Sequence, residues 1–229
     1  MNFKGHQPLS LIDYPKKMCT VLFTGGCSFH CYFCHNPELV VDYKKLPDIP
    51  GAQILKFLDG RRGFLDGICI TGGEPTLWKE LPEFMKQVKD MNFLIKLDTN
   101  GTNPEFLTSV IENKLVDYIA MDIKTTPAKY PDVVEIENID ISKIDESIKI
   151  LLNSTIEYEF RTTVFPEFFS QIDAQEIGHW IKGAKSYILQ KPRTIKMLSK
   201  GRFKEKDIPL YTDAELLKLA TFLPNCTIR

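Results

Sequence analysis

Short apolar segments recur along the chain, and longer amphipathic segments separate them. The apolar segments are rich in β-branched and aromatic residues, which is typical of strands that are covered on both faces. They predict strands at residues 19–24, 68–71, 93–98, 118–123, 156–165 and 186–190.

The segments between these strands have the spacing and the start signals of helices. Residues 51–59 and 81–89 carry apolar side chains at helical spacing. Further helices are expected to begin at Asn103–Pro104, at Ser142, at Asp173 with Glu176, and at Thr212 with Glu215. Residues 129–140 and 200–209 are expected to be loops. Strands that alternate with helices predict parallel β/α units, in an open sheet or in a barrel.

Composition narrows the possible classes of protein. The 229 residues are 43% hydrophobic and 26% charged, which excludes a disordered chain. The formal net charge of −1 gives no basic excess for binding nucleic acid. No apolar stretch approaches the roughly 18 residues of a membrane span, and residues 1–17 lack the core of a secretory signal. We therefore expect one cytoplasmic domain over residues 1–229, with no membrane or nucleic-acid partner.

Three cysteines are crowded into the segment GGCSFHCYFCHNPE, residues 25–38. Cys27, Cys31 and Cys34 have the spacing C-x3-C-x2-C, and iron–sulfur clusters are held by thiolates in short loops of this kind. Three thiolates for a cluster of four irons leave one iron open to a substrate or a cofactor. The other cysteines lie in predicted strands or near the C-terminus, and we expect none of them to be a ligand: Cys19, Cys69 and Cys226.

Structural zinc is the alternative for this loop. Zinc requires four ligands, so His30 or His35 would have to complete a Cys3His site. Each histidine is adjacent to a cysteine of the loop, which makes it awkward for both neighbours to bind one ion. The loop therefore favours an iron–sulfur cluster.

The segment CSFHCYFC matches the CxxxCxxC signature of the radical S-adenosylmethionine (SAM) superfamily, with Phe33 just before the third cysteine. The longer string SLIDYPKKMCTVLFTGGCSFHCYFCHNPEL, residues 10–39, resembles the activating enzymes of glycyl-radical proteins. It is most similar to the activating proteins of anaerobic ribonucleoside-triphosphate reductases. The resemblance continues through TGGEP, LDTNG and MDIK and is weaker beyond residue 165.

Polar residues follow the predicted strands at their carboxyl ends, where ligand sites of α/β folds gather. Besides the cysteine loop, they are Gly72, Gly73, Glu74, Asp98, Thr99, Asn100, Asp122, Lys124, Arg161 and Gln190. Asp122 and Lys124 are two residues apart and share one face of a strand, so a structural ion pair between them is the alternative to a ligand site.

The resemblance implies roles for these positions. Residues 72–74 would hold the SAM amino group, and Lys124 would approach SAM. Asp98, Thr99 and Asp122 would be candidates for a monovalent cation site. Asp13, in SLIDYP, matches a position that contacts the substrate peptide in pyruvate formate-lyase activating enzyme. The remaining SAM-site positions are Phe33, His35, Asn100, Arg161 and Gln190, where Gln190 stands in place of a histidine of many relatives.

The resemblance also implies the fold and the chemistry. We expect a partial (β/α)6 barrel with one 4Fe-4S cluster, which would cleave SAM reductively to a radical able to remove hydrogen. Flavodoxin or ferredoxin would supply the electron in an anaerobic cytoplasm. The radical would be placed on a glycine of a partner enzyme, and the expected partner is anaerobic ribonucleotide reductase. The alternatives are a radical SAM enzyme acting on a small metabolite, like the 7-carboxy-7-deazaguanine synthases, and a zinc-stabilised binding module. The HNPE sequence after Cys34 argues against the former.

Overall fold

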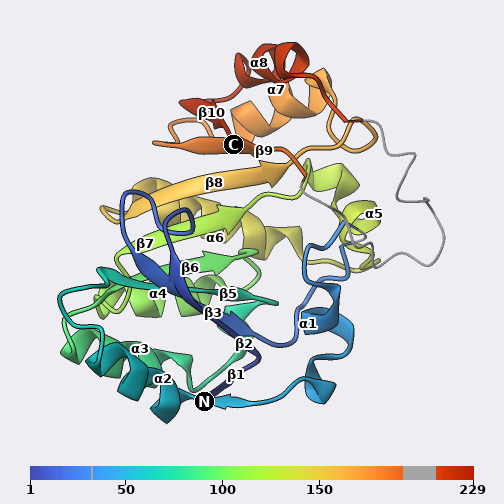
Figure 1. The fold of residues 1–229 in the computed structure, drawn as a ribbon. Helices are drawn as coiled ribbons and strands as arrows, with labels where there is room; N and C mark the ends of the chain where they lie inside the picture. Colours follow the sequence, from blue (N-terminus) through green and yellow to red (C-terminus); the bar gives the residue numbers. More distant parts are fainter. Residues whose placement is uncertain (32, 193–209) are drawn as a thin grey trace. The chain divides into compact units, whose positions relative to one another are not determined.

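Parallel strands with helices between them make up most of the chain (Figure 1). The structure is a computed structural model, and it describes residues 1–31, 33–192 and 210–229. The described residues form two compact units. Unit 1 is Met1–Ser28, Glu38–Thr99 and Asn103–Ala120, and unit 2 is Phe29–Pro37, Asn100–Thr102 and Met121–Arg229. The single domain over residues 1–229 stays a prediction.

Unit 1 is built on a sheet whose inner strands are parallel. β3, β5 and β6 run parallel to one another, and β2 pairs with β3 in the antiparallel direction. A separate antiparallel pair joins β1 to β4. The strands are β1 (Asn2–Phe3), β2 (Gly5–Ser10), β3 (Cys19–Thr24), β4 (Ile49–Pro50), β5 (Gly67–Gly72), β6 (Leu94–Thr99) and the first part of β7 (Tyr118–Asp122).

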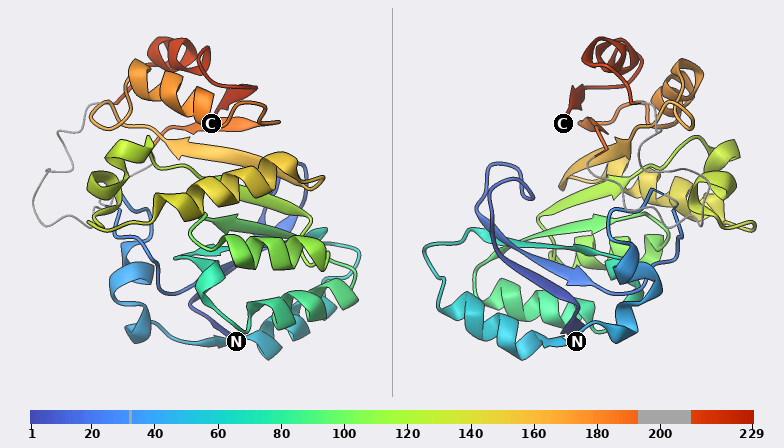
Figure 2. Two further views of the ribbon diagram at one scale, coloured as in Figure 1. Left: turned by 180° about the vertical axis from the view of Figure 1, so that it is seen from behind. Right: turned by 45° about the vertical axis from the view of Figure 1, so that its right-hand side comes forward.

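Helices α2, α3 and α4 lie together on one side of this sheet (Figure 2). Their apolar stripes are buried, with Ile54 and Leu58 on α2 and Met85 and Val88 on α3 fully enclosed. The helical segments are α1 (Pro37–Val41), η1 (Tyr43–Lys45), α2 (Gly51–Asp59), η2 (Pro75–Leu77), α3 (Leu81–Asp90) and α4 (Pro104–Glu112).

The two faces of the unit 1 sheet differ in chemistry. Strand alternation places the buried side chains of Ile68, Ile70, Ile95 and Leu97 on one face. On the opposite face, Cys19 and Val21 of β3 and Cys69 of β5 form a small buried cluster with Tyr14.

Unit 2 continues the β/α alternation. β8, β9 and β10 are parallel, and β10 adds an edge strand beside β9. Its elements are the end of β7, η3 (Pro127–Lys129), α5 (Tyr130–Val134), α6 (Ile141–Asn153), β8 (Glu157–Thr163), α7 (Gln171–Trp180), β9 (Tyr187–Gln190), α8 (Asp213–Ala220) and β10 (Cys226–Ile228).

The six predicted strands are confirmed with ends shifted by at most two residues, and so is the α/β class. Two predicted helix starts are wrong. Asp140, rather than Ser142, caps α6, because its Oδ1 accepts the Ser142 backbone N–H at 3.1 Å. Ser170 caps α7, and Asp173 is the third helical residue in a reciprocal capping box.

The prediction of a loop at 129–140 is also wrong, because α5 occupies Tyr130–Val134. This helix is fixed by tertiary packing: Tyr130, Val133 and Val134 are completely buried. The other predicted loop, 200–209, lies outside the described residues. The predicted starts at Asn103 and Thr212 are confirmed, each with its side chain accepting a backbone N–H of the first turn.

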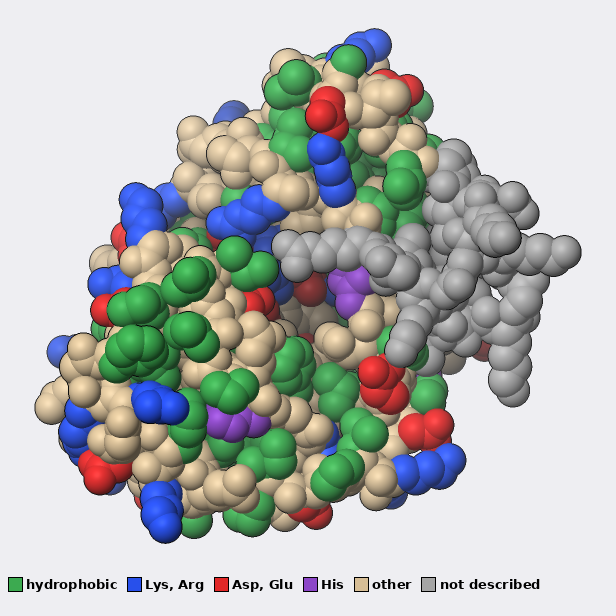
Figure 3. Space-filling model, in the orientation of Figure 1, with side chains coloured by type: hydrophobic (Ala, Val, Ile, Leu, Met, Phe, Trp, Pro, Cys, Tyr) green, Lys and Arg blue, Asp and Glu red, His purple; other side chains and the backbone are tan. Residues whose placement is uncertain are grey.

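Charges of both signs are interspersed over the face shown in Figure 3, as the near-zero net charge predicts. Among the described residues, none of the helices combines the length and the apolar character that a membrane span requires.

Arg229, which follows β10, neutralises the buried carboxylate of Glu159. The Glu159 side chain is 1% exposed, and Arg229 donates to both of its oxygens, at 3.0 and 2.8 Å. A bidentate ion pair of this kind fixes the end of β10 to β8, the strand that carries Glu159.

Replacing Arg229 by Ala is expected to destabilise the protein by about 2–3 kcal/mol, because the buried Glu159 carboxylate would lose a cationic partner. The melting temperature should fall by roughly 4–10 °C when followed by circular dichroism. Lys191→Ala is the matched control, since its partner Asp213 is exposed and the pair contributes little. Equal melting temperatures for the two variants would contradict the assignment.

Candidate active site

The cysteine loop begins directly after β3 and passes from unit 1 into unit 2. Cys27 belongs to unit 1, where the preceding Gly26 donates its N–H to Leu39 O at 2.7 Å. Cys31 and Cys34 belong to unit 2, where the Cys34 N–H donates to Cys31 O at 3.0 Å. The loop is thus held by backbone hydrogen bonds within each unit.

The chemistry of this donor set fits an iron–sulfur cluster. Burial raises the pKa of the Cys31 thiol to about 11, and the nearby Lys124 ammonium opposes this shift. Such a sulfur is deprotonated when a metal binds it. Among the described residues, no three His, Cys, Asp or Glu side chains converge as ligands of a single metal ion. A cubane does not require such convergence, because each thiolate binds a different iron.

The GGE turn after β5 requires its glycines for close backbone packing. A Cβ atom on Gly73 would lie 1.9 Å from the carbonyl oxygen of Gly26, and Gly72 adopts a left-handed φ of +116°. The Gly73 N–H donates to Thr24 O at 2.9 Å, and the Glu74 N–H donates to Gly26 O at 2.7 Å. The turn therefore lies against the start of the cysteine loop.

The Glu74 carboxylate is buried and held rigidly. Its Oε1 accepts hydrogen bonds from the Thr76 hydroxyl at 2.6 Å and from the Thr99 hydroxyl at 2.8 Å. It also accepts the Thr76 backbone N–H at 3.2 Å. These bonds connect the end of β5 with the end of β6, so Thr99 helps to fix Glu74.

Asp122 lies between two cations in unit 2. Lys124 Nζ and Arg161 Nε each lie 2.9 Å from a different oxygen of its carboxylate. Burial alone would raise the pKa of Asp122, but Arg161 and Lys124 outweigh it and hold the pKa well below its ordinary value. The ion pair that the sequence spacing allows is therefore present, and it positions Lys124.

A second charged pair lies on β6 in unit 1. The ammonium of Lys96 contacts Oδ1 of Asp98 and lies 3.7 Å from Cys69 Sγ. Lys96 is not among the predicted site residues, although a lysine in the middle of an apolar strand is a signal that a buried carboxylate lies nearby.

The other predicted positions have defined surroundings. Asn100 is buried and its side-chain oxygen accepts from the N–H and hydroxyl of Thr102, at 3.1 and 2.8 Å. Phe33 is buried with its ring centroid 5.0 Å from that of Phe165. Gln190 ends β9 and pairs with Thr163, and its carbonyl accepts the Val164 N–H.

Among the predicted positions, His35 is exposed and Asp13 is half-buried. Ser10 donates its hydroxyl to Oδ2 of Asp13 and accepts the Asp13 backbone N–H, so the carboxylate belongs to the turn after β2.

The predicted site residues are thus brought together in two groups, one in each unit. Unit 1 holds Cys27, Gly72, Gly73, Glu74, Asp98 and Thr99 around the ends of β3, β5 and β6. Unit 2 holds Cys31, Cys34, Phe33, Asp122, Lys124 and Arg161. The roles of these residues stay predictions.

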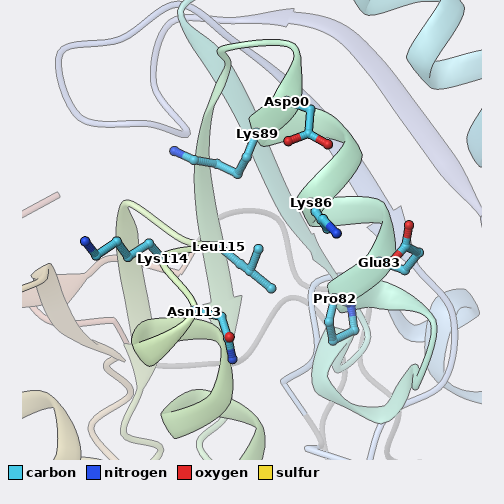
Figure 4. Close-up of a pocket in the computed structure, with 8 residues that line it drawn as sticks. All are labelled: Pro82, Glu83, Lys86, Lys89, Asp90, Asn113, Lys114 and Leu115. Atoms are coloured by element: carbon cyan, nitrogen blue, oxygen red, sulfur yellow. The ribbon is translucent and has the colours of Figure 1, made fainter.

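A surface pocket of about 460 Å³ lies elsewhere in unit 1, between α3 and the turn after α4 (Figure 4). Its walls carry side chains of both signs, and Lys89 already pairs with Asp117 at 2.7 Å. This mixture is typical of a solvated groove between helices.

Comparison with known proteins agrees with the interpretation of the cysteine loop as a radical SAM motif. The sequence model of the Radical SAM superfamily matches residues 21–174. A Methanocaldococcus jannaschii protein, provisionally named a glycyl-radical enzyme activating enzyme, is 35% identical over 98% of this chain and 94% of its own length. A 7-carboxy-7-deazaguanine synthase of Thermoplasma acidophilum is 26% identical over 60% of this chain and 62% of its own length.

Among solved structures, Streptococcus suis SuiB bound to its precursor peptide SuiA matches with a TM-score of 0.67 at 13% identity. The match covers 91% of this chain and 48% of SuiB. It confirms the fold type expected from the sequence. The superfamily match spans well over half of the chain, so this protein is a member of the radical SAM superfamily, an enzyme of the kind that uses a 4Fe-4S cluster and SAM.

Proposed function

We propose that this radical SAM enzyme generates a glycyl radical on a partner enzyme, and that the partner is an anaerobic ribonucleoside-triphosphate reductase. The observation that carries the proposal is the 35% identity to a provisionally named activating enzyme, because it extends over 98% of the chain. Similarity confined to the cofactor site would be shared by radical SAM enzymes of other functions.

The arrangement of side chains supports SAM chemistry. When bound, the reduced cluster supplies one electron to SAM, which releases methionine and leaves a radical that removes hydrogen. We assign Cys27, Cys31 and Cys34 to the cluster. The backbone of the GGE turn, held by Glu74, would bind the amino group of SAM. Lys124, fixed by Asp122, would bind its carboxylate.

Exposed apolar side chains beside Asp13 support a protein partner. Leu11 and Ile12 are 66% and 65% exposed in the turn between β2 and β3, and Leu9 nearby is 42% exposed. Neighbouring exposed apolar side chains are a feature of surfaces that bind other proteins. Glycine is a sensible target, since the radical left by loss of its α-hydrogen is stabilised by both flanking amides. Flavodoxin or ferredoxin would supply electrons in an oxygen-free cytoplasm.

Action on a small metabolite is the second candidate function. The observation that favours it is the 26% identity to a 7-carboxy-7-deazaguanine synthase. That similarity covers only 60% of this chain, so the activating function has the stronger support.

The proposal predicts a glycyl radical on the reductase. The reduced protein, SAM and the anaerobic reductase of the same organism, mixed without oxygen, should give a doublet by electron paramagnetic resonance. A reductase variant with Ala at its radical glycine is the control and should give no doublet. Absence of the doublet together with turnover of a deazapurine precursor would support the second candidate instead.

The cluster assignment predicts which cysteines are needed for iron. Cys27→Ala, Cys31→Ala and Cys34→Ala should each lose most of the bound iron after anaerobic reconstitution, because each removes a thiolate ligand. Cys226→Ala, which changes a cysteine of β10, should keep the wild-type iron content. Full iron content in Cys31→Ala would overturn the assignment.

The SAM site predicts a specific defect for Lys124→Ala. Loss of one charge-assisted hydrogen bond should weaken SAM binding by roughly ten- to a hundred-fold, measured by equilibrium dialysis. Iron content should be unchanged, and the melting temperature should change little, because Arg161 still neutralises Asp122. Lys149→Ala, which removes an exposed lysine of α6, is the control. Unchanged SAM affinity in Lys124→Ala would leave the lysine a purely structural role.

A further inference from the structure

A lysine is buried in the middle of the unit 1 sheet. The Lys96 side chain is only 2% exposed, and strand register places Lys96 beside Cys69 of β5. Lys96 and Asp98 are two residues apart on β6, so both side chains lie on the same face. The ammonium contacts Oδ1 of Asp98.

Among the contacts of the described residues, Asp98 is the carboxylate that touches Lys96. The Asp13 carboxylate lies near the same cluster, where it adds to burial in raising the pKa of Cys19. Burial, with Asp98 next in effect, raises the pKa of Cys69 well above its ordinary value, so this neighbour is a neutral thiol. Cys19, Val21 and Tyr14 form a buried cluster with Cys69. A buried ammonium among such groups is stable only beside a carboxylate, because desolvation of an unpaired charge is too costly.

Asp98 is the residue that the resemblance assigns to a monovalent cation, together with Thr99 and Asp122. The Thr99 side chain lies on the opposite face of β6 and donates its hydroxyl to Glu74. Asp122 contacts Lys124 and Arg161. Each carboxylate of the expected cation site therefore faces a cationic side chain of this chain.

We infer that the Lys96 ammonium takes the place of the monovalent cation beside Asp98, so that SAM binding does not depend on sodium or potassium. A lysine ammonium is a compact point charge, which suits it to this replacement. Lys96 is a positioning residue: it neutralises Asp98 and fixes the direction of its carboxylate at the end of β6. The inference depends on SAM binding and is independent of which substrate the radical attacks.

The test compares SAM affinity in three salts at equal ionic strength: potassium, sodium and tetramethylammonium chloride. Reconstituted wild-type protein should bind SAM with dissociation constants that agree within about two-fold. Lys96→Met keeps the length of the side chain but removes its charge. It should bind SAM at least roughly ten-fold more weakly in tetramethylammonium, and potassium should restore most of the affinity. Lys89→Met, which removes a lysine paired with Asp117 in the same unit, should behave as wild type.

A second measurement does not depend on SAM. Potassium should raise the melting temperature of Lys96→Met over its value in tetramethylammonium, and it should leave that of the wild type unchanged. A wild type whose SAM affinity falls ten-fold without sodium and potassium would overturn the inference, even if Lys96→Met failed to fold. Undiminished SAM affinity of Lys96→Met in tetramethylammonium, or a loss that potassium does not restore, would also overturn it. The glycyl-radical experiment has a separate outcome, because it concerns the partner and not the salt.

Discussion

The candidate site depends on the close approach of two backbone turns at the ends of β3 and β5. Gly26 accepts the Glu74 N–H at 2.7 Å, and the missing side chain of Gly73 leaves room for the Gly26 carbonyl. Even a methyl group at Gly73 would force the turns apart. This contact fixes the direction in which the chain leaves β3, and thereby where the first cysteine of the loop begins. The buried Glu74 carboxylate accepts a hydrogen bond from the Thr99 hydroxyl, and this bond fixes the turn after β5 to the end of β6.

Paired charges are the second principle of the fold. Asp98 with Lys96, Asp122 with Lys124 and Arg161, and Glu159 with Arg229 are each buried or half-buried acids that the chain neutralises itself. Two of these pairs combine residues two positions apart: Lys96 and Asp98 lie on β6, while Asp122 ends β7 and Lys124 follows it. The third joins residues that are 70 positions apart, and it holds an edge strand in place. Each of these pairs holds the donor groups of its cation in a fixed direction.

Sequence patterns predict the strands well because apolar runs covered on both faces have few alternative structures. Helix starts are less certain where several capping residues lie close together: Ser142 is a hydrogen-bond partner of the true cap, Asp140, and Asp173 is the partner of Ser170. β10 escapes prediction because its stability comes from pairing with β9 and from the distant contact of Arg229. Periodicity carries no signal for such long-range partners.

The sequence predicts which residue types form the site and at which edge of the sheet they lie. The contacts that surround each of these side chains are seen only in the folded structure. The cysteine spacing identifies the loop, and strand alternation predicts the pair of Asp122 and Lys124. The role of Glu74 as the acceptor for Thr99 is invisible in the sequence, since the two are joined only through neighbouring strands. Lys96 is visible in the sequence, but its importance emerges only with its burial.

The cysteines outside the loop differ from those of the loop in their accessibility to reagents. Cys19 and Cys69 are buried in β3 and β5. Burial raises the pKa of Cys19 to about 12 and that of Cys69 well above its ordinary value, so neither forms the thiolate that oxidants and alkylating agents attack. Cys27 and Cys34 are partly accessible. Cys226 of β10 is also partly accessible, but burial raises the pKa of its thiol to about 11. A peroxide would therefore reach the thiols of the loop before the enclosed thiols of β3 and β5. Oxygen would abolish cofactor assembly while the polypeptide stays folded, and such damage is reversible by thiol reductants until higher oxides form.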